Sequence, residues 1–406
     1  MEQGLSLKLR LYPNADERQA FKSLHEQYRQ ACQYISEAYF ESRFTLSRRE
    51  LHDLYYLDIR DRFGLKSQQA ASVLRTVLAR YKSVNTQFKK EPKRYYDSAS
   101  GKATYVNRDI DWLERPVQFH KGQADLVYKR DYRFTTDGRL RITTLGELVD
   151  VSFNERYFDK YLVDEQWKLG TAKLVLNRDK RFLHIGITKE LPDYTKEQNQ
   201  HVVGVDLGLR FLATTYDEKG ETTFYSGKSI THQRRKYRQL RKELQSTNTT
   251  SSKRRLKAIG QRENCWMSDI NHQLSKALVE KYGANTTFVV EDLSGITRNI
   301  KRTTSDNTAD LTSWAFYEFV QQLTYKANLM GSQVVIVSAQ YTSQRCPKCG
   351  QIDKHSRDHR MHHYHCQSCG YQSNDDRVGA MNLYELGKQY ISGVKNPKFT
   401  KSVNAS

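Results

Sequence analysis

The first apolar pattern in the chain has a period of two. Leucine alternates with polar residues over positions 5–11, which favours a half-buried strand, and Pro13 is placed to end it. Helical spacing follows, and the apolar positions of the first helix are Phe21, Leu24, Tyr28, Ala31, Ile35 and Ala38. Residues 14 to about 93 are therefore predicted to form a helical insert behind a single strand.

Local start and stop signals divide this insert into three helices. The signals are two capping-box pairs, Asn14/Glu17 and Ser47/Glu50, a stop at Gly64 and a third cap at Ser67. The period returns to two between about 103 and 190, where Asp137-Gly138 separates two alternating runs and predicts a β-hairpin. We expect the first strand to join this β-rich segment, with the helices inserted between.

The polar stretch 191–200 is predicted to be a linker. Three strands are expected after it, at about 202–206, 211–216 and 221–226. A basic helical region follows, then an apolar strand FVVED, a helix and the strand QVVIVSA; the two helical segments are 229–282 and 312–330. This element order is that of a ribonuclease H-like domain. The tail from Ser392 lacks periodicity and is predicted to be disordered.

Composition restricts the class of partner. The 406 residues suffice for two to three domains. Lys and Arg number 66 against 46 Asp and Glu, a formal charge of +20, and 26 Tyr, 16 Phe and 4 Trp accompany the cations. Cations interleaved with aromatic rings suit nucleic acid better than a membrane surface. No run of about 18 apolar residues occurs and the start lacks a signal-peptide core, so we expect no membrane span and a cytoplasmic protein.

The positive charge is concentrated in the basic helical region, where only Glu243 opposes twelve cations between 228 and 262. A solvated helical face is the competing interpretation, but so unbalanced a run repels itself unless it meets a polyanion. Tyr237 and Trp266 are expected to pack in the core. The predicted nucleic-acid-binding residues are Arg234, Arg235, Lys236, Arg238, Arg241, Lys242, Lys253, Arg254, Arg255 and Lys257.

Four of the six cysteines form two C-x2-C pairs separated by sixteen residues: Cys346, Cys349, Cys366 and Cys369. This spacing is typical of one tetrahedral, structural zinc ion. Gly350 and Gly370 are placed to supply the positive φ that each turn requires. A redox dithiol is the competing interpretation, and the histidines between the pairs, among them His362 and His363, are expected to face solvent or phosphate.

Three carboxylates stand at the ends of predicted elements. Asp206 and Glu291 each follow an apolar run, and Asp376 precedes a helix. A single acid of this kind is usually a solvated strand end, but three in one domain indicate a cluster that needs a cation. Magnesium or manganese prefers such carboxylates, and a pair of ions about 3.5–4 Å apart supports phosphodiester hydrolysis.

Together these residues resemble the TnpB (OrfB) family, the transposon-encoded relatives of type V CRISPR nucleases. GVDLGLRFLAT resembles the family's first RuvC motif, FVVEDLSGI the second, and YTSQRCPKCG with YHCQSCGYQSNDDRVGAMNLYELG the zinc insert that runs into the third. SWAFYEFVQQLTYKANLMG is similar to the helix before that insert. Asp376 fits the register of the third acid, although Val378 stands where the family has Asn, so Asp375 remains the alternative.

The resemblance covers residues 199–390, approximately. In the N-terminal half only the organisation into domains matches the family, not the motifs. It implies an α+β multidomain fold with a RuvC-like α/β nuclease domain, a zinc-ribbon insert, and an N-terminal wedge β-barrel interrupted by a helical recognition lobe. The implied segments are a wedge strand at 1–13, the helical lobe at 14–100, the rest of the wedge at 101–192, the nuclease at 199–340, the zinc-binding insert at 341–371, the third motif at 372–391 and a disordered tail at 392–406.

The implied function is that of an RNA-guided DNA endonuclease of an insertion sequence, which cuts double-stranded DNA beside a short adjacent motif. The implied catalytic acids are Asp206, Glu291 and Asp376 with about two magnesium ions, and the implied partners are a guide RNA and target DNA on a monomeric protein. Three alternatives stay open: a small type V CRISPR effector, a catalytic transposase, and an RNA-guided DNA-binding regulator without cleavage.

Overall fold

The computed structural model describes residues 1–96, 101, 103–154, 161, 166–177, 179–193, 201–293, 316–358 and 361–400. The chain separates into two compact units: Glu2–Glu190, and Leu191–Ser406 with Met1. Several predicted features lie partly outside the described residues, namely the linker at 194–200, the first residues of the helix predicted from 312, and the tail at 401–406.

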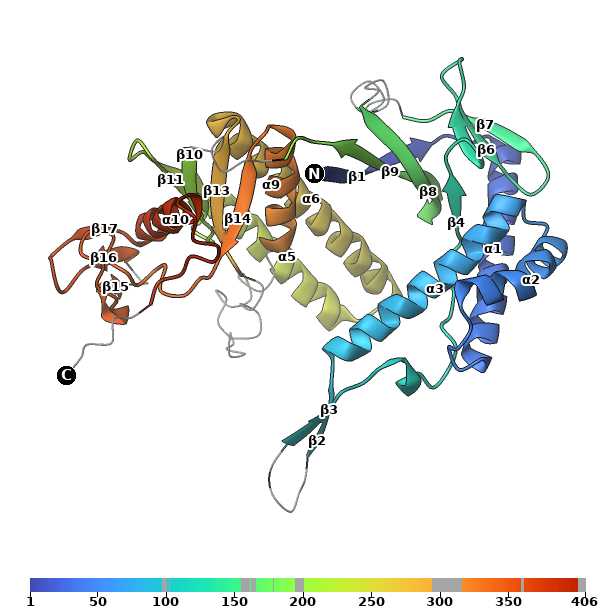
Figure 1. Ribbon diagram of the computed structural model, residues 1–406, viewed down its shortest axis with the longest axis horizontal. Coiled ribbons are helices and arrows are strands. Elements are labelled where there is room, and N and C mark those ends of the chain that lie inside the picture. Colours follow the sequence, from blue (N-terminus) through green and yellow to red (C-terminus); the bar gives the residue numbers. More distant parts are fainter. Residues whose placement is uncertain are drawn as a thin grey trace. The chain divides into compact units, whose positions relative to one another are not determined.

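The first unit, Glu2–Glu190, contains a four-stranded antiparallel sheet in the order β1-β9-β8-β4 (Figure 1). Its strands are β1 (Glu2–Leu11), β4 (Gln123–Val127), β8 (Trp167–Asn177) and β9 (Lys180–Glu190). β1 pairs with β9 along its whole length, from Glu2 opposite Glu190 to Leu11 opposite Arg181. This pairing confirms that the first strand joins the later β-rich segment.

A second antiparallel sheet in this unit has the order β5-β6-β7. Its strands are β5 (Tyr132–Phe134), β6 (Leu140–Thr143) and β7 (Leu148–Val151). The predicted hairpin is confirmed, because Gly138 takes a φ of 76° in the turn between β5 and β6. Isolated bridges, Leu11 to Phe153 and Tyr128 to Tyr132, join the edges of the two sheets.

Three helices form the insert between β1 and β4: α1 (Ala15–Glu41), α2 (Arg48–Phe63) and α3 (Ser67–Lys90). Both capping boxes are formed, and Gly64 ends α2 with a φ of 62°. The predicted cap at Ser67 is wrong: Lys66 is the N-cap, and the Gln69 side chain accepts from the Lys66 backbone instead. One 3-10 turn, η1 (Ile110–Trp112), follows later in the unit.

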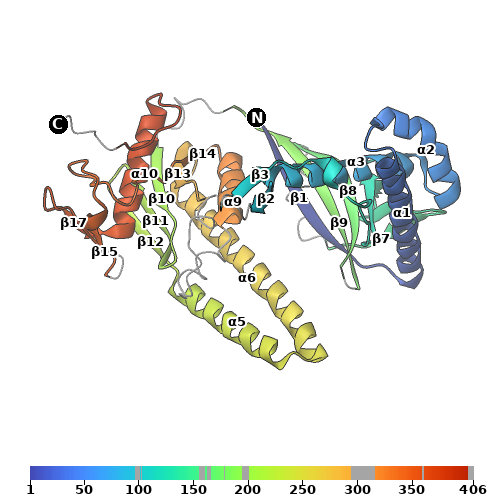
Figure 2. The same cartoon turned by 90° about the horizontal axis from the view of Figure 1, so that it is seen from below.

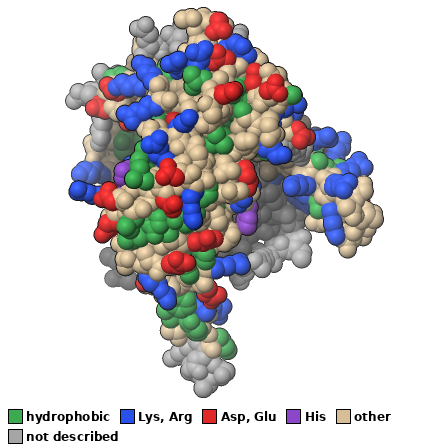
Figure 3. All heavy atoms as spheres, turned by 90° about the vertical axis from the view of Figure 1, so that its right-hand side faces the viewer, with side chains coloured by type: hydrophobic (Ala, Val, Ile, Leu, Met, Phe, Trp, Pro, Cys, Tyr) green, Lys and Arg blue, Asp and Glu red, His purple; other side chains and the backbone are tan. Residues whose placement is uncertain are grey.

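A two-stranded hairpin, β2 (Lys93–Tyr96) with β3 (Ala103–Val106), extends from the end of α3 (Figure 1). Arg108 fixes its base by donating from Nε to the Glu91 carbonyl over 2.7 Å. None of its described residues is buried. Tyr96 and Tyr105 are 67% and 62% exposed, so the hairpin presents aromatic rings to solvent. Hydrophobic and basic side chains cover this projection at the lower end of Figure 3.

The second unit contains a five-stranded sheet in the order β12-β11-β10-β13-β14. Its strands are β10 (His201–Asp206), β11 (Phe211–Asp217), β12 (Thr222–Ser226), β13 (Thr286–Glu291) and β14 (Gln333–Val337). The first three form an antiparallel meander, which confirms the three predicted strands, whereas β13 and β14 run parallel to β10. The predicted basic region is a pair of helices, α5 (Lys228–Thr247) and α6 (Thr250–Tyr282), lying side by side in Figure 2.

Alternation along the strands directs side chains to the two faces of this sheet. Val203, Val205 and Phe288 belong to the core with α6 and α9 (Phe316–Leu329). Val202 and Val289 belong instead to the core with α10 (Asp375–Ile391). Because side chains two apart share a face, the last residues of β10 and β13, Asp206 and Glu291, lie on the α10 face.

An insert between β14 and α10 carries the four cysteines. The insert contains a three-stranded sheet in the order β15-β16-β17. Its strands are β15 (Arg357–Asp358), β16 (His363–His365) and β17 (Gln372–Asn374), and the 3-10 turn η3 (Lys354–Ser356) precedes β15. After α10, Phe399 is 6% exposed and packs with Val202 and Leu386. The prediction of disorder from Ser392 is therefore wrong for 392–400, because the buried Phe399 ring holds this segment to the core.

Candidate active site and cysteine cluster

Parallel strand pairing brings Asp206 and Glu291 together across 85 residues of sequence. Val205 lies opposite Val290 in the pairing of β10 with β13, so the two acids are the next neighbours at the carboxyl ends of adjacent strands. Thr342, just after β14, donates a hydrogen bond from its hydroxyl to Glu291 Oε1. The two carboxylates share one face and one edge of the sheet.

Close packing of α10 on β10 brings in the third acid. Gly204 leaves room for the helix, because a Cβ there would lie 2.1 Å from the Ala380 carbonyl oxygen. A Cβ on Gly379 would lie 2.9 Å from Cγ of Asp206, so the Asp206 carboxylate rests against the α10 backbone. Asp376, the second residue of α10, has Oδ1 3.9 Å from a Cβ built on Gly208, two residues after Asp206.

Burial and mutual repulsion raise the pKa values of these three acids. Burial, followed by the nearby charges of Glu291 and Asp376, raises the pKa of Asp206 well above its usual range. Burial also raises the pKa of Glu291, opposed by the Thr342 hydrogen bond and the positive Arg357. Burial and then the charge of Asp375 raise the pKa of Asp376. Clustered acids with raised pKa values are a site at which a bound cation would favour the ionised form.

Asp375, the alternative third acid, is bound by the cysteine insert. Its Oδ2 accepts from Arg357 Nε over 2.9 Å, and its Oδ1 accepts from the Asp376 backbone N–H over 3.0 Å. The side chain is 1% exposed and is also 3.4 Å from Nδ1 of His362. Asp376 differs, because its Oδ2 is buried without a hydrogen-bond partner in the described structure. The geometry therefore leaves Asp376, rather than Asp375, with a free oxygen for a metal ion.

Two sets of three or more metal-ligating side chains converge within the described ranges. Each set has ligand atoms within 4.8 Å of one another: the four cysteines, and His362 with Asp375 and Asp376. Asp206 and Glu291 are not in the second set. The three predicted acids are thus neighbours rather than one tight ligand sphere.

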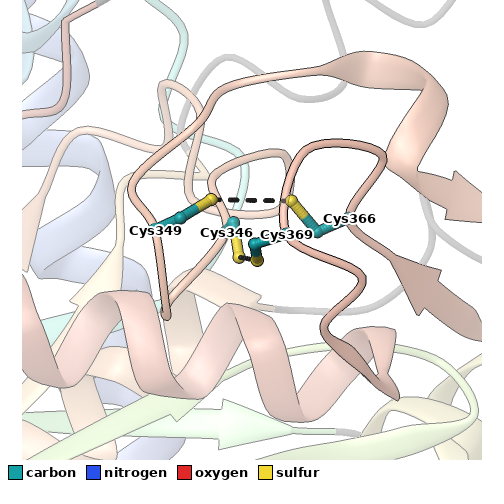
Figure 4. Close-up of side chains that lie close together, drawn as sticks. All are labelled: Cys346, Cys349, Cys366 and Cys369. Carbon is teal, nitrogen blue, oxygen red and sulfur yellow. Dashed lines mark hydrogen bonds between the residues drawn. The ribbon is translucent and has the colours of Figure 1, made fainter.

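The four predicted cysteines lie together (Figure 4). Sγ of Cys346 is 3.6 Å from Sγ of Cys369, and Sγ of Cys349 is 3.6 Å from Sγ of Cys366. These separations are too long for disulfides. They match the edge of about 3.8 Å that follows for a tetrahedron with Zn–S bonds of about 2.3 Å. The cluster therefore has the donor set and the size that zinc requires.

Two matching turns build the cluster. Gly350 and Gly370 have φ values of 79° and 69°, as predicted, and each donates its N–H to the carbonyl of the first cysteine of its pair. Hydrogen bonding from the Gln351 backbone lowers the pKa of Cys349 to about 7, whereas burial raises the pKa of Cys346 to about 12. A low thiol pKa favours the thiolate that binds metal.

The predicted nucleic-acid-binding cations on α5 and α6 differ in exposure. Arg234 departs from the prediction because it is only 5% exposed. Arg241 forms an ion pair with Glu263, an acid just beyond the basic run. Tyr237 packs on Trp266, with ring centroids 6.2 Å apart; both are half-buried, and of the two only Trp266 packs against the core, as predicted. The exposed members of the predicted set are Arg235, Lys236, Lys242, Lys253, Arg254, Arg255 and Lys257.

Sequence reasoning missed the residues that hold the site in place. Asn382 is fully buried on α10 and donates from Nδ2 to the carbonyls of Thr342 and Arg345, both over 2.8 Å. It thereby ties α10 to the segment that carries the Glu291 partner. Arg357 was missed because nothing in a short basic loop distinguishes the cation that folds back on Asp375.

The exposed tyrosines of β2 and β3 were also missed, although KRYY places aromatic residues directly after cations.

Comparison with known proteins shows which families and relatives these motifs match. Residues 184–297 match the OrfB_IS605 family, described as a probable transposase, and residues 316–383 match the Cas12f1-like TNB domain. A CRISPR-associated endodeoxyribonuclease Cas12f1 of Syntrophomonas palmitatica is 31% identical over 46% of this chain and 39% of its own length. The chain is related to the TnpB and Cas12f1 proteins. A putative RNA-guided DNA endonuclease InsQ of Escherichia coli K12 is 30% identical over 47% of this chain and 50% of its own.

These matches to Cas12f1 and InsQ span half or less of each relative's length. Similarity in three dimensions extends further. The structure of the mini-RNA-guided endonuclease CRISPR-Cas_phi3 has a TM-score of 0.55 with this chain and covers 98% of it and 94% of its own chain, at 10% sequence identity. At this identity the match establishes a shared mixed α/β multidomain fold. No helix among the described residues is long and apolar enough to span a membrane.

Proposed function

We propose that this TnpB relative is an RNA-guided DNA endonuclease of an insertion sequence, which cuts double-stranded DNA beside a short adjacent motif. The observation that supports this best is the convergence of Asp206 and Glu291 at adjacent parallel strand ends with Asp376 at the start of α10. The strand order, three antiparallel strands followed by two parallel ones, supports a RuvC-like nuclease domain at 199–340 with its third motif at 372–391.

In this proposal Asp206, Glu291 and Asp376 hold about two magnesium or manganese ions. The buried, unpartnered Oδ2 of Asp376 fits a metal ligand, and so do the raised pKa values of the acids. Bound metal would supply an activated water and stabilise the leaving oxygen. Thr342 orients the Glu291 carboxylate, and Asn382 holds that threonine segment on α10. The four thiolates hold one structural zinc ion in an insert at 341–371 that contacts target nucleic acid.

The guide RNA and target DNA are proposed to contact the exposed cations of α5 and α6, and the N-terminal unit is proposed to serve as wedge and helical recognition lobe. A net charge of +20 suits two nucleic-acid chains on one monomer. Sequence specificity would come from pairing between guide and target, with the protein reading the short motif, as in other RNA-guided nucleases.

The decisive experiment is plasmid cleavage by the complex with guide RNA in magnesium. Asp206→Asn, Glu291→Gln and Asp376→Asn should each lose cleavage, because one carboxylate is removed, while RNA and DNA binding stays intact. Asp292→Asn is the matched control, since Asp292 is the next residue after Glu291 and is exposed. Cleavage by Glu291→Gln at the wild-type rate would contradict the proposal.

A second arm of this experiment separates the alternatives. Target choice should follow the guide when its sequence is changed, and RNA-free protein should not cut. Joined DNA products would indicate a transposase, and guided binding by the wild type without cleavage would indicate a regulator. A repeat array beside the gene would indicate a type V CRISPR effector.

A further inference from the structure

Two buried polar atoms beside the acids have no hydrogen-bond partner in the described structure: His362 Nδ1 and Asp376 Oδ2. Their residues form a set with Asp375 in which one ligand atom of each residue lies within 4.8 Å of the others. An unpaired buried polar group is destabilising, so such groups in a native protein require an explanation. Asp376 is 8% exposed, and a cation bound by both residues would satisfy both atoms.

The backbone holds His362 in position over the first turn of α10. Its carbonyl accepts from the Asp375 backbone N–H over 3.3 Å and from Nδ2 of Asn374 over 3.2 Å. Its φ of 53° lies in the left-handed region, which is uncommon for a residue with a side chain. These contacts place the imidazole beside Asp376, although 13 residues separate the two in sequence.

The third member of the set, Asp375, has its oxygens occupied. Oδ2 accepts from Arg357 and Oδ1 accepts from the Asp376 N–H. The remaining donors are therefore one imidazole nitrogen and one carboxylate oxygen. An uncharged imidazole with a carboxylate is a common pair of ligands for a divalent transition metal.

We propose that His362 Nδ1 and Asp376 Oδ2 bind the same divalent cation, so that one of the two ions of the proposed nuclease has a nitrogen ligand from the cysteine insert. The inference rests on the proposed function and adds a ligand to that site. It also implies a metal preference. Divalent first-row metals from manganese onward bind mixed nitrogen and oxygen sites, whereas magnesium demands oxygen ligands and retains its waters, so this position favours Mn²⁺ over Mg²⁺.

The test is electron spin-echo spectroscopy of Mn²⁺ on the full-length, zinc-loaded chain without nucleic acid. Wild-type protein should show the coupling of a directly bound imidazole nitrogen, and His362→Ala should lose it. Mn²⁺ affinity, followed by the signal of free Mn²⁺, should fall at least about tenfold in His362→Ala, since even outer partners of metal ligands change affinity by about 10–100-fold.

The matched control is His363→Ala, because His363 is the adjacent residue and is exposed. It should keep both the nitrogen coupling and the Mn²⁺ affinity. The zinc content, measured by elemental analysis, should stay at one ion per chain in both variants, which excludes collapse of the insert.

Two results would overturn the inference in distinguishable ways. Mn²⁺ that binds without nitrogen coupling, and is lost in Asp206→Asn, would show that the acids alone hold the metal; the proposed function would then stand and His362 would only pair with Asp375. A wild-type chain that binds no Mn²⁺ at this site and does not cleave guided DNA would overturn both.

Discussion

Gly379 offers a direct test of where the Asp206 carboxylate lies. In Gly379→Ala the new Cβ would be 2.9 Å from Cγ and 3.0 and 3.1 Å from the two carboxylate oxygens of Asp206. The first contact is shorter than real Cβ atoms make, and the other two are tighter than most. Moving α10 away from β10 would relieve them but would open the close packing of Ala380 on Gly204. We therefore expect the carboxylate to move instead, by several tenths of an ångström.

The expected effects on stability and on catalysis differ in size. Alanine in a helix interior is favoured over glycine by about 1 kcal/mol, whereas overpacking costs about 1–3 kcal/mol. The free energy of unfolding should therefore fall by no more than about 2 kcal/mol. A misplacement of about 1 Å at a reacting group costs about 100-fold in rate, so we expect guided cleavage to fall about 10- to 100-fold.

Two other glycines provide controls. A Cβ on Gly260 in α6 meets nothing within 4 Å, so Gly260→Ala should gain up to about 1 kcal/mol of stability and cleave normally. A Cβ on Gly387 would lie 2.5 Å from Val202 and 2.6 Å from Val289, so Gly387→Ala should lose stability through core overpacking. Urea unfolding and plasmid cleavage measure the two effects separately. A folded Gly379→Ala protein that cleaves at the wild-type rate would refute this placement of Asp206.

Three further predictions concern other parts of the chain. Cys349→Ser should lower the zinc content below one ion per chain and lower the thermal midpoint, by elemental analysis and calorimetry, because structural zinc contributes directly to folding. Burial lowers the pKa of His25 from 6.5 to about 4, so the unfolded chain binds more protons than the folded chain between these pH values. The free energy of unfolding therefore falls as the pH drops through that window, by about 2 kcal/mol at pH 5. His25→Leu should show a smaller loss between pH 7 and pH 5 in urea unfolding. Replacing Lys253, Arg254 and Arg255 with Gln should reduce the slope of log K against log salt concentration for RNA binding by about 0.7–0.9 per cation that contacts phosphate. Lys276→Gln, which removes an ammonium that pairs with Glu280, should change this slope little. Equal slopes in all variants would argue against α6 as the RNA-binding face.

Alternation and turn chemistry predicted most of the secondary structure because both act locally. The three strands at 201–226 and the hairpin at Gly138 follow from side-chain period and from the need for positive φ. The cysteine cluster was predictable for the same reason, since each C-x2-C turn is local and only the pairing of two turns is not. The proximity of Asp206 to Glu291 is different in kind, because it depends on parallel pairing of β10 with β13.

The departures from prediction involve contacts with partners distant in sequence. The basic run around Arg234 has the composition of an exposed surface, yet that guanidinium is buried in the folded unit. Phe399 sits in a polar tail without periodicity, but one aromatic ring suffices to fix such a segment when the core offers Val202 and Leu386. The pairing of Asp375 with Arg357 joins two polar residues of the insert and leaves no pattern in the sequence.

The cysteine insert and the third acid are continuous in the chain, which links the two proposed metal sites. β17 ends at Asn374 and α10 begins at Asp375, so no flexible residue separates the sheet of the insert from the acid at 376. Arg357, on β15 of the same sheet, holds Asp375, and breaking such a buried ion pair costs about 3–5 kcal/mol. Because the four thiolates and the Arg357 contact constrain the same short sheet, the geometry of Asp376 depends on an intact insert. A zinc ion held by the four cysteines, as proposed, would thus affect the proposed cleavage indirectly, through the position of one carboxylate.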